Sequence, residues 1–428
     1  MIAPEPLRPV DAAWLHMDRP ENTADIVALF SFDRPLPLDR FRRLLQDRLL
    51  PHDRFRQRIV DHGQRPVWLR DRRFRIDHHL LREPMDAEDE GALRRLVGQI
   101  ASDQLDLRHP PWRVHAVGGR RGAHALVVKL HHCLGDGFAL VALLLSLADE
   151  HRDDASRASS RPAGALERVA GLVRAAPSLV AAAPAFLRSL LGMTLLPAAP
   201  ATPALSGLRR AAWSSGWPLP AIRAAGRAAG GTVNDVLLAA LAGALRRVPP
   251  EGNGARALVP VNLRPLREVG RADTLGNAFG LVFLDLPTEL DAPADRLAAV
   301  RERMQILRQR PDAQVAYAIL GALGLGPRGL ERLGTEFFSR KASLVVTNVP
   351  GPRRALHLAG RRLDRLVFWV PHPAALGLGV SLLSYAGEVT VGVRADAAVL
   401  ADPAALAAAF QEELAALAPA RAPRRPAS

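Results

Sequence analysis

The spacing of hydrophobic residues along the chain predicts helices that alternate with short buried strands. Between Asp39 and Leu50 the apolar residues recur every three or four positions, which is typical of an amphipathic helix; the buried face would carry Phe41, Leu44, Leu45, Leu49 and Leu50. A second helix is predicted over Gly91–Leu105. The valine-rich run Ala123–Leu130 predicts a buried strand, and a strongly apolar helix is expected after it over Phe138–Asp149. Strands and helices mixed in this order indicate an α/β core.

The second half of the chain repeats this pattern. Helices are predicted over Leu219–Ala229, Val233–Arg247 and Pro403–Leu417. Strands are predicted over Ala257–Val261, Leu281–Leu286, Ser343–Val346, Gly377–Ser384 and Glu388–Val393. A length of 428 residues favours about two domains. We place the first at 1–160 and the second at 206–417, joined by an Ala/Pro-rich helical crossover at 161–205; the Pro- and Arg-rich tail 418–428 is expected to be disordered.

The connecting segment has two interpretations. Arg161–Leu196 is apolar and rich in alanine, and it is interrupted by prolines and by arginines such as Arg174 and Arg188. It is either a helical crossover between domains or an interfacial segment that touches a membrane or a lipid droplet. No apolar stretch predicts a helix that spans a bilayer, because the uncharged run Ser189–Leu208 contains three prolines.

Composition narrows the classes of partner. The net charge is +14, and all but two of the 57 basic residues are arginines; the lysines are Lys129 and Lys341. This bias is typical of a genome-wide coding preference, although it would also steer the protein toward anionic lipid or a nucleotide-bearing substrate. No zinc-finger, homeodomain or RNP-type pattern supports nucleic acid. The single cysteine, Cys133, and the lack of a signal-peptide pattern predict a cytoplasmic protein, with peripheral contact to the inner membrane face or lipid inclusions left open.

The candidate chemistry lies where a buried strand ends and a helix begins, in the run His131-His132-Cys133-Leu134-Gly135-Asp136-Gly137. Neighbouring residues on an extended backbone point to opposite sides, so only one imidazole can face a given cavity. For the same reason the two histidines are a poor metal pair, and no third ligand follows at zinc spacing, so no metal site is predicted. An imidazole, whose ordinary pKa is about 6.5, is well matched to removing a proton from an alcohol.

The pattern of two histidines, three residues and Asp-Gly resembles the signature of the coenzyme A-dependent acyltransferase and condensation-domain superfamily. Within it, the chain resembles the bacterial wax ester synthase/diacylglycerol acyltransferase family over nearly its full length, from Val10–Trp14 to Gly392–Asp396. The family's other motifs appear in order; they are Asn234–Ala239, Pro260–Pro265, Leu275–Asn277 and Thr347–Pro352. The chain departs from the family at Pro111, where leucine is usual before Trp112, and at Thr347, where serine is commoner.

The resemblance implies a fold of two chloramphenicol acetyltransferase-like domains, each a mixed sheet with helices, with a channel between them. It implies that His132 is the general base, which deprotonates a hydroxyl that attacks an acyl-CoA thioester directly. Acyl-CoA is then a substrate rather than a cofactor, and the acceptor is diacylglycerol or a long-chain alcohol. Supporting roles follow for His131, for Asp136 in orienting the ring and for Gly137 in shaping the loop. The substrate-side candidates are Trp112, Asn234, Asp235, Asn277, Thr347 and Asn348.

Plainer interpretations stay open for several of these residues. Asn234 and Asp235 could simply cap the helix that they begin, and Trp112 could be a packing residue. Cys133 suits core packing better than nucleophilic attack, and the pair His78-His79 is interpreted as a surface or packing feature. Two other functions also remain: a condensation-type enzyme that takes its acyl group from a carrier protein, and a catalytically silent lipid-binding protein.

Overall fold

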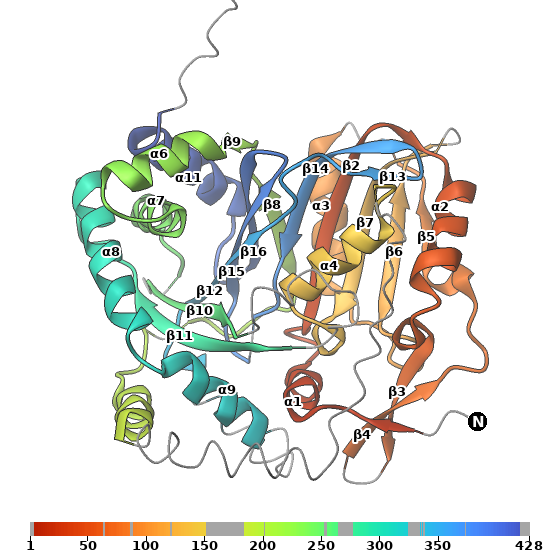
Figure 1. Ribbon diagram of the computed structural model, residues 1–428, viewed down its shortest axis with the longest axis horizontal. Helices are drawn as coiled ribbons and strands as arrows, with labels where there is room; N and C mark the ends of the chain where they lie inside the picture. Colours follow the sequence, from red (N-terminus) through yellow and green to blue (C-terminus); the bar gives the residue numbers. More distant parts are fainter. Residues whose placement is uncertain are drawn as a thin grey trace, which may run out of the picture.

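The computed structural model describes residues 4–62, 65–85, 89–119, 122–150, 184–200, 202–251, 255–263, 277–323, 334, 336, 339–372 and 374–419. Its strands form two large mixed sheets and one small sheet, with helices packed on them (Figure 1). This is the mixed α/β architecture that the sequence predicts. Residues 161–183 of the predicted crossover and 420–428 of the predicted disordered tail lie outside the described residues.

The first large sheet has the strand order β13-β14-β2-β7-β6-β5. Its strands are β2 (Asp25–Leu36), β5 (Leu80–Glu83), β6 (Trp112–Val117), β7 (Ala123–His131), β13 (His357–Leu358) and β14 (Arg361–Trp369). One face is covered by α4 (Gly137–Leu147) and by α2 (Leu38–Leu44), which continues as a π-helical turn, η1 (Leu45–Leu49). The other face is covered by α3 (Glu90–Ser102). Successive side chains of β2 point to opposite faces of the sheet. Ile26 therefore packs in the core under α4 and α2, and Val27 packs in the core under α3.

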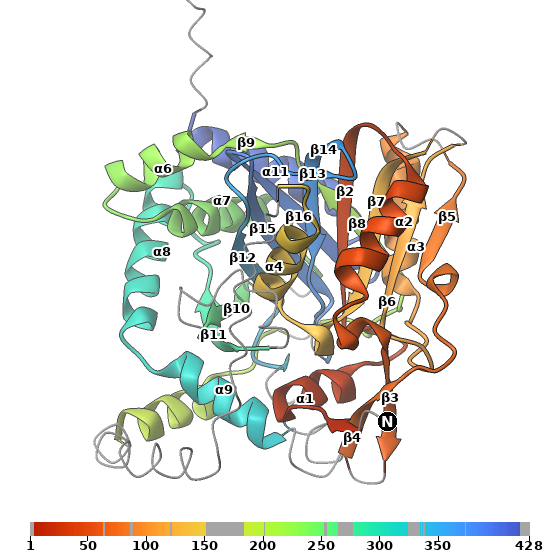
Figure 2. The ribbon, with the colours of Figure 1, turned by 45° about the vertical axis from the view of Figure 1, so that its right-hand side comes forward.

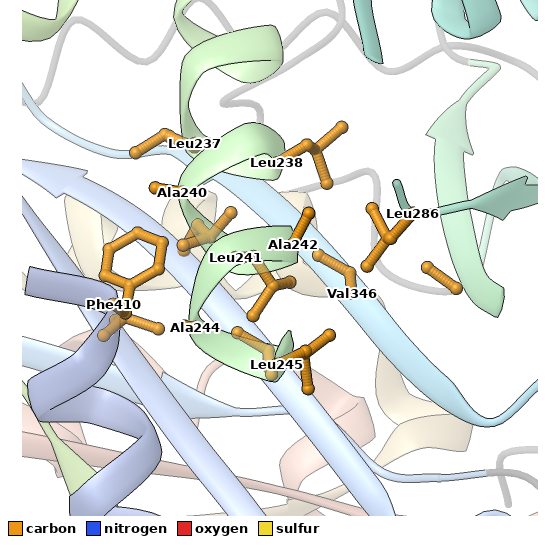
Figure 3. Packing of buried hydrophobic residues seen from close by; sticks show 14 of the residues in the cluster. Leu237, Leu238, Ala240, Leu241, Ala242, Ala244, Leu245, Leu286, Val346 and Phe410 are labelled. Atoms are coloured by element: carbon orange, nitrogen blue, oxygen red, sulfur yellow. The ribbon is translucent and has the colours of Figure 1, made fainter. Parts of the chain in front are cut away.

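The second large sheet has the order β11-β10-β12-β15-β16-β8, with β9 paired to β16. Its strands are β8 (Arg209–Trp213), β9 (Trp217–Pro218), β10 (Arg256–Asn262), β11 (Phe279–Asp285), β12 (Leu344–Pro350), β15 (Leu378–Tyr385) and β16 (Glu388–Asp396). The associated helices are α6 (Leu219–Ala228), α7 (Val233–Arg247), α8 (Pro293–Arg308), α9 (Asp312–Leu323) and α11 (Pro403–Leu417). Figure 3 shows α7 at the centre of this core, with Leu237 and Leu241 close to Phe410 of α11 and Val346 of β12 nearby.

A strand from late in the chain completes the first sheet. β14 pairs antiparallel with β2, with Leu366 opposite Phe30, so 357–369 lies in the first sheet although it falls within the predicted second domain. The predicted domain boundaries themselves stay a prediction. The remaining elements lie beside the two sheets: a small sheet of β1 (Glu5–Pro6), β4 (Arg65–Arg70) and β3 (Gln57–His62), and helix α1 (Pro9–Met17).

Among the described residues, no single helix combines the length and the apolar character needed to cross a membrane. Helices α6 and α7 reach that length only as a pair, and the two meet at an angle of 95°.

Candidate active site

The backbone of His132 is held from both halves of the chain. It follows the last residue of β7 and opens a short 3₁₀ helix, η4 (His132–Leu134). Its N–H donates to the carbonyl of Ala24 at 2.9 Å. Its own carbonyl accepts from Nδ2 of Asn277 at 2.8 Å. One of these contacts comes from just before β2 and the other from just before β11, so the two sheets fix the position of this residue together.

The imidazole of His132 lies among aromatic rings. The indole of Trp14, on α1, stacks on it with 4.0 Å between ring centroids and 18° between ring planes. Phe279 meets it edge-on with the centroids 5.8 Å apart. The residue is only 5% exposed, and within the described part of the chain its buried Nδ1 atom has no hydrogen-bond partner.

Burial sets the charge state of this ring. Because an imidazolium in an apolar site loses its hydration, burial lowers the pKa of His132 to about 4, although the nearby carboxylate of Asp136 favours the charged form. His132 is therefore neutral at pH 7. A neutral imidazole has one nitrogen lone pair free to accept a proton, which is the requirement for a base.

Two carboxylates hold the segment that contacts His132. Asp11 Oδ1, on α1, accepts from Asn277 Nδ2 at 2.8 Å and from the Asn277 backbone N–H at 3.1 Å. Asp136 Oδ2 accepts from the N–H of Ala278 at 3.1 Å. The predicted residues Asp136 and Asn277 are thus brought together with His132. Asp11 was not among the predicted site residues, and its signal in the sequence was its place in the Val10–Trp14 motif.

The neighbours of His132 face elsewhere. His131 Nδ1 accepts from the backbone N–H of Cys133 at 3.2 Å, and its Nε2 lies 3.9 Å from Asp18 Oδ2. The two imidazoles therefore have different surroundings, as an extended backbone leads us to expect. Burial raises the pKa of the Cys133 thiol well above its ordinary value, so Cys133 is protonated and unsuited to nucleophilic attack. No three His, Cys, Asp or Glu side chains gather in the described residues to hold a metal ion.

A wholly apolar pocket of about 90 Å³ begins beside the motif. Gly137 lines it, and a Cβ atom there would lie 2.9 Å from Cγ2 of Val349, so the close approach of β12 requires glycine. Trp112 also lines it, and its Nε1 donates to the carbonyl of Phe55 at 2.9 Å, so this predicted residue both packs and shapes the pocket. Other lining side chains include Phe30 of β2, Leu45 of η1, Val128 of β7, Leu144 of α4 and Phe368 of β14.

A second apolar pocket, of about 40 Å³, is lined by Trp14. Its walls come from α1, β11 and α9, and they include Met17, Leu281, Phe283 and Ile319. Trp14 lines this pocket and also stacks on His132, so it contacts both the pocket and the imidazole. Gly137 of the motif therefore lines the first pocket, and Trp14, which stacks on His132, lines the second.

The remaining predicted residues lie at the start of α7 and in β12. Asn348 Nδ2 donates to Asn234 Oδ1 at 3.1 Å, so these two side chains contact each other. Asp235 forms a capping box with Thr232 at the start of α7 and an ion pair of 3.2 Å with Arg308. This is the capping role that the sequence left open. Thr347 lies buried in β12, opposite Ser381 of β15.

The surroundings of the second histidine pair are those of packing residues. His79 is buried between Phe74, at 5.0 Å, and Trp112, at 4.4 Å between ring centroids. Its Nδ1 lies 2.8 Å from the carbonyl of Trp112, and burial lowers its pKa to about 4. His78 is exposed and lies edge-on to His109.

Comparison with known proteins places this geometry in a family. The model of the wax ester synthase/diacylglycerol acyltransferase catalytic domain matches residues 7–165, and that of the family's C-terminal domain matches 275–418. A protein of Mycobacterium tuberculosis named as a diacylglycerol O-acyltransferase is 31% identical over 396 residues, which cover 83% of this chain and 87% of the relative.

Solved structures share the fold. A wax ester synthase/diacylglycerol acyltransferase from Marinobacter aquaeolei superposes with a TM-score of 0.69 at 24% identity, covering 96% of this chain and 98% of that one. The first condensation domain of the CDA synthetase superposes with a TM-score of 0.64 at 16% identity, covering 97% and 96% of the two chains. The chain belongs to the wax ester synthase/diacylglycerol acyltransferase family of acyltransferases.

Proposed function

We propose that this protein transfers a long-chain acyl group from acyl-CoA to the hydroxyl of diacylglycerol or of a long-chain alcohol, with His132 as the general base. The observation that carries the proposal is a neutral, buried imidazole beside two apolar pockets, one lined by Gly137 of the same motif and the other by Trp14, which stacks on the ring. Neutral lipid synthesis needs this combination, because both reactants bring long alkyl chains to one proton acceptor.

The reaction is a direct displacement. His132 accepts the hydroxyl proton of the acceptor as the oxygen attacks the thioester carbonyl, which forms a tetrahedral intermediate. The carbon–sulfur bond then breaks, and the imidazolium returns the proton to the departing coenzyme A thiolate. The ester and coenzyme A leave, His132 is neutral again, and no acyl-enzyme forms. Asp136 stabilises the imidazolium by its charge, and the amide of Asn234 is a candidate donor to the developing oxyanion.

The two pockets suit the two substrates. In the pocket beside Gly137, each buried methylene group contributes about 0.8 kcal/mol of binding free energy, so the pocket favours long chains over short ones. The acceptor approaches through the pocket behind Trp14 and has to displace the indole to reach His132. Trp14 Nε1 is buried and makes no hydrogen bond to any described residue, so this displacement breaks only packing contacts.

The direct test is to identify the product. The purified full-length protein is incubated with labelled palmitoyl-CoA and an equimolar mixture of diacylglycerol and hexadecanol, and the lipids are separated by thin-layer chromatography. We expect triacylglycerol or wax ester to form in step with the release of coenzyme A. Release of coenzyme A with only free fatty acid, or lipid binding without turnover, would refute the transfer reaction.

The identity of the donor has its own test, because condensation domains share this fold. The same palmitoyl group is offered either on coenzyme A or on the phosphopantetheine arm of a carrier protein. We expect turnover with the coenzyme A thioester. Turnover with the carrier-bound thioester alone would show that the donor is a carrier protein and that the proposed donor is wrong.

A further inference from the structure

A helix over 184–195 exposes a stripe of large apolar side chains. Leu187, Leu191 and Leu195 are 55%, 50% and 78% exposed. Residues four positions apart lie on the same side of an α-helix, so the three leucines form one continuous face. The opposite side carries the buried residues Ser189 and Met193. Three such leucines on one surface helix are unusual, because exposed apolar residues are normally scattered.

The buried side of this helix leads toward the reaction centre. Met193 packs in one cluster with Val315 and Ala316 of α9, and in Figures 1 and 2 the helix lies directly beside α9 at the lower left. Helix α9 lines the second apolar pocket through Ala316 and Ile319, and the far wall of that pocket is Trp14. The exposed leucines therefore belong to a helix that packs on α9, and α9 lines the pocket through which an apolar molecule would approach His132.

Cationic side chains surround the helix and fix it in place. Lys341 Nζ donates to the carbonyl of Thr194 at 2.9 Å and also to that of Leu196, which satisfies the C-terminal end of the helix. Arg188 projects from the exposed side. Arg310, which is ion-paired with Asp312 at 3.3 Å, lies so close that a Cβ atom at position 192 would approach its Nη2 to 2.9 Å. An apolar face bordered by arginines is the composition of helices that lie in the headgroup region of an anionic bilayer.

We propose that the face formed by Leu187, Leu191 and Leu195, called here the leucine face, docks on a bilayer that contains anionic phospholipid. The docked helix brings the pocket between α9 and Trp14 to the lipid surface, so that a lipid acceptor enters without crossing water. The proposed docking depends only on the exposed helix, whereas the delivery of a lipid acceptor also rests on the function proposed above.

Vesicle binding tests the docking without any substrate. The test variant carries Leu187→Gln, Leu191→Gln and Leu195→Gln, which removes apolar area and keeps both net charge and helix propensity. The matched control carries Ala224→Gln, Ala228→Gln and Ala415→Gln, three exposed positions on α6 and α11 at the opposite end of the molecule (Figures 1 and 2). Full-length proteins are sedimented with vesicles of equal parts phosphatidylglycerol and phosphatidylcholine, and thermal unfolding verifies the fold of each.

We expect the leucine variant to lose at least about tenfold in vesicle partitioning, because its three side chains no longer bury apolar area in the lipid. The control should bind like the unmodified protein. Binding of the unmodified protein should also weaken on pure phosphatidylcholine and in the Arg188→Gln variant. Equal partitioning of the leucine variant and the control would overturn the docking face, and binding that ignores lipid charge would overturn the anionic partner.

An activity assay separates this proposal from the proposed function. Acyl transfer is measured with diacylglycerol presented either in the same vesicles or dispersed in detergent. The leucine variant should fall several-fold on vesicles and match the control in detergent. Equal activity of the two proteins on vesicles would refute delivery through the docked helix. If no protein turns over substrate but the binding difference persists, the proposed function fails and the docking holds.

Discussion

The two large sheets are built from the same apolar residue types, yet one core is filled and the other is hollow. Around α7, the side chains of Ala239, Ala240 and Leu241 have no exposed surface, and Phe410 fills the space beside them (Figure 3). Against the first sheet, α4 and η1 leave an apolar pocket of about 90 Å³. The filled core supplies a rigid scaffold, and the hollow one supplies the apolar space that the proposed function assigns to an acyl chain.

The difference follows from the residues that face each sheet. Four alanines in α7, at 239, 240, 242 and 244, let the helix approach its neighbours closely, because the distance between packed elements depends on the side chains at the contact. The corresponding positions in α4 and η1 are mostly leucine, such as Leu45 and Leu144, and they meet Phe30 and Phe368 from the sheet. Large side chains on both sides hold the layers apart.

The largest expected effect comes from inserting the same bulky ring into each core. Ala240→Phe should lower the free energy of unfolding by about 3 kcal/mol, because no space exists for the ring. Ala28→Phe places the ring in the pocket and should cost less than about 1 kcal/mol. Urea unfolding of both variants measures the difference. Equal losses would show that the first core is not hollow.

A second prediction concerns acid stability and a buried histidine beside the hollow core. Burial lowers the pKa of His79 to about 4, whereas the unfolded chain takes up this proton near 6.5. The unfolded state therefore binds more protons between these values, so the stabilisation is complete above about pH 6.5 and is lost as the pH falls toward 4. His79→Gln should remove about 2 kcal/mol of the decrease in unfolding free energy between pH 7 and pH 4.5. If urea unfolding shows the same decrease in unfolding free energy between these two pH values in both proteins, the lowered pKa of His79 is contradicted.

A smaller effect is expected on chain-length preference. Ala28→Phe shortens the pocket, so kcat/KM for palmitoyl-CoA should fall about tenfold relative to hexanoyl-CoA, which equals the loss of about two buried methylene groups. Ala28→Val is the matched variant and should cause a weaker shift in the same direction. If Ala28→Phe slows both donors equally, the hollow core is not the site of the acyl chain.

The smallest effect is expected on kcat when Asp11, which holds Asn277 against the backbone of His132, is replaced. Asp11→Ala removes the acceptor that holds Asn277 and should lower kcat about fivefold with little change in KM, because His132 loses position but no substrate contact. Arg8→Ala is the control, since it breaks the 2.8 Å ion pair with Asp11 and leaves Asn277 in place. A rise in KM alone, or the same loss in both variants, would argue against a positioning role.

Local patterns in the sequence were enough to predict several elements and the turn that carries His132. The predicted helices over Val233–Arg247 and Pro403–Leu417 coincide with α7 and α11, because apolar periodicity and, in α11, an N-terminal proline mark their bounds. The predicted helix over Asp39–Leu50 is α2 only as far as Leu44, after which the backbone continues as a π turn. The turn at His132 lies between a strand and a helix, as the motif predicted.

The parts that could not be predicted depend on contacts between distant segments. Arg361–Trp369 gives no local sign that it pairs with a strand more than 300 residues earlier, because register is set by the facing strand. The stacking of Trp14 on His132 depends on how α1 docks against η4. The volume of the pocket likewise depends on the spacing of helix and sheet, which residue patterns along one segment do not encode.

The central claim is that His132 takes the proton from the acceptor hydroxyl, and the most direct measurement is kcat/KM for ester formation in His132→Ala beside His131→Ala. We predict that His132→Ala loses about a thousandfold while its circular dichroism and unfolding midpoint stay close to those of the unmodified protein. His131→Ala, which removes the contacts with the Cys133 N–H and with Asp18 but leaves the His132 imidazole in place, should lose far less. Ester formation by folded His132→Ala within tenfold of the unmodified protein would contradict the account.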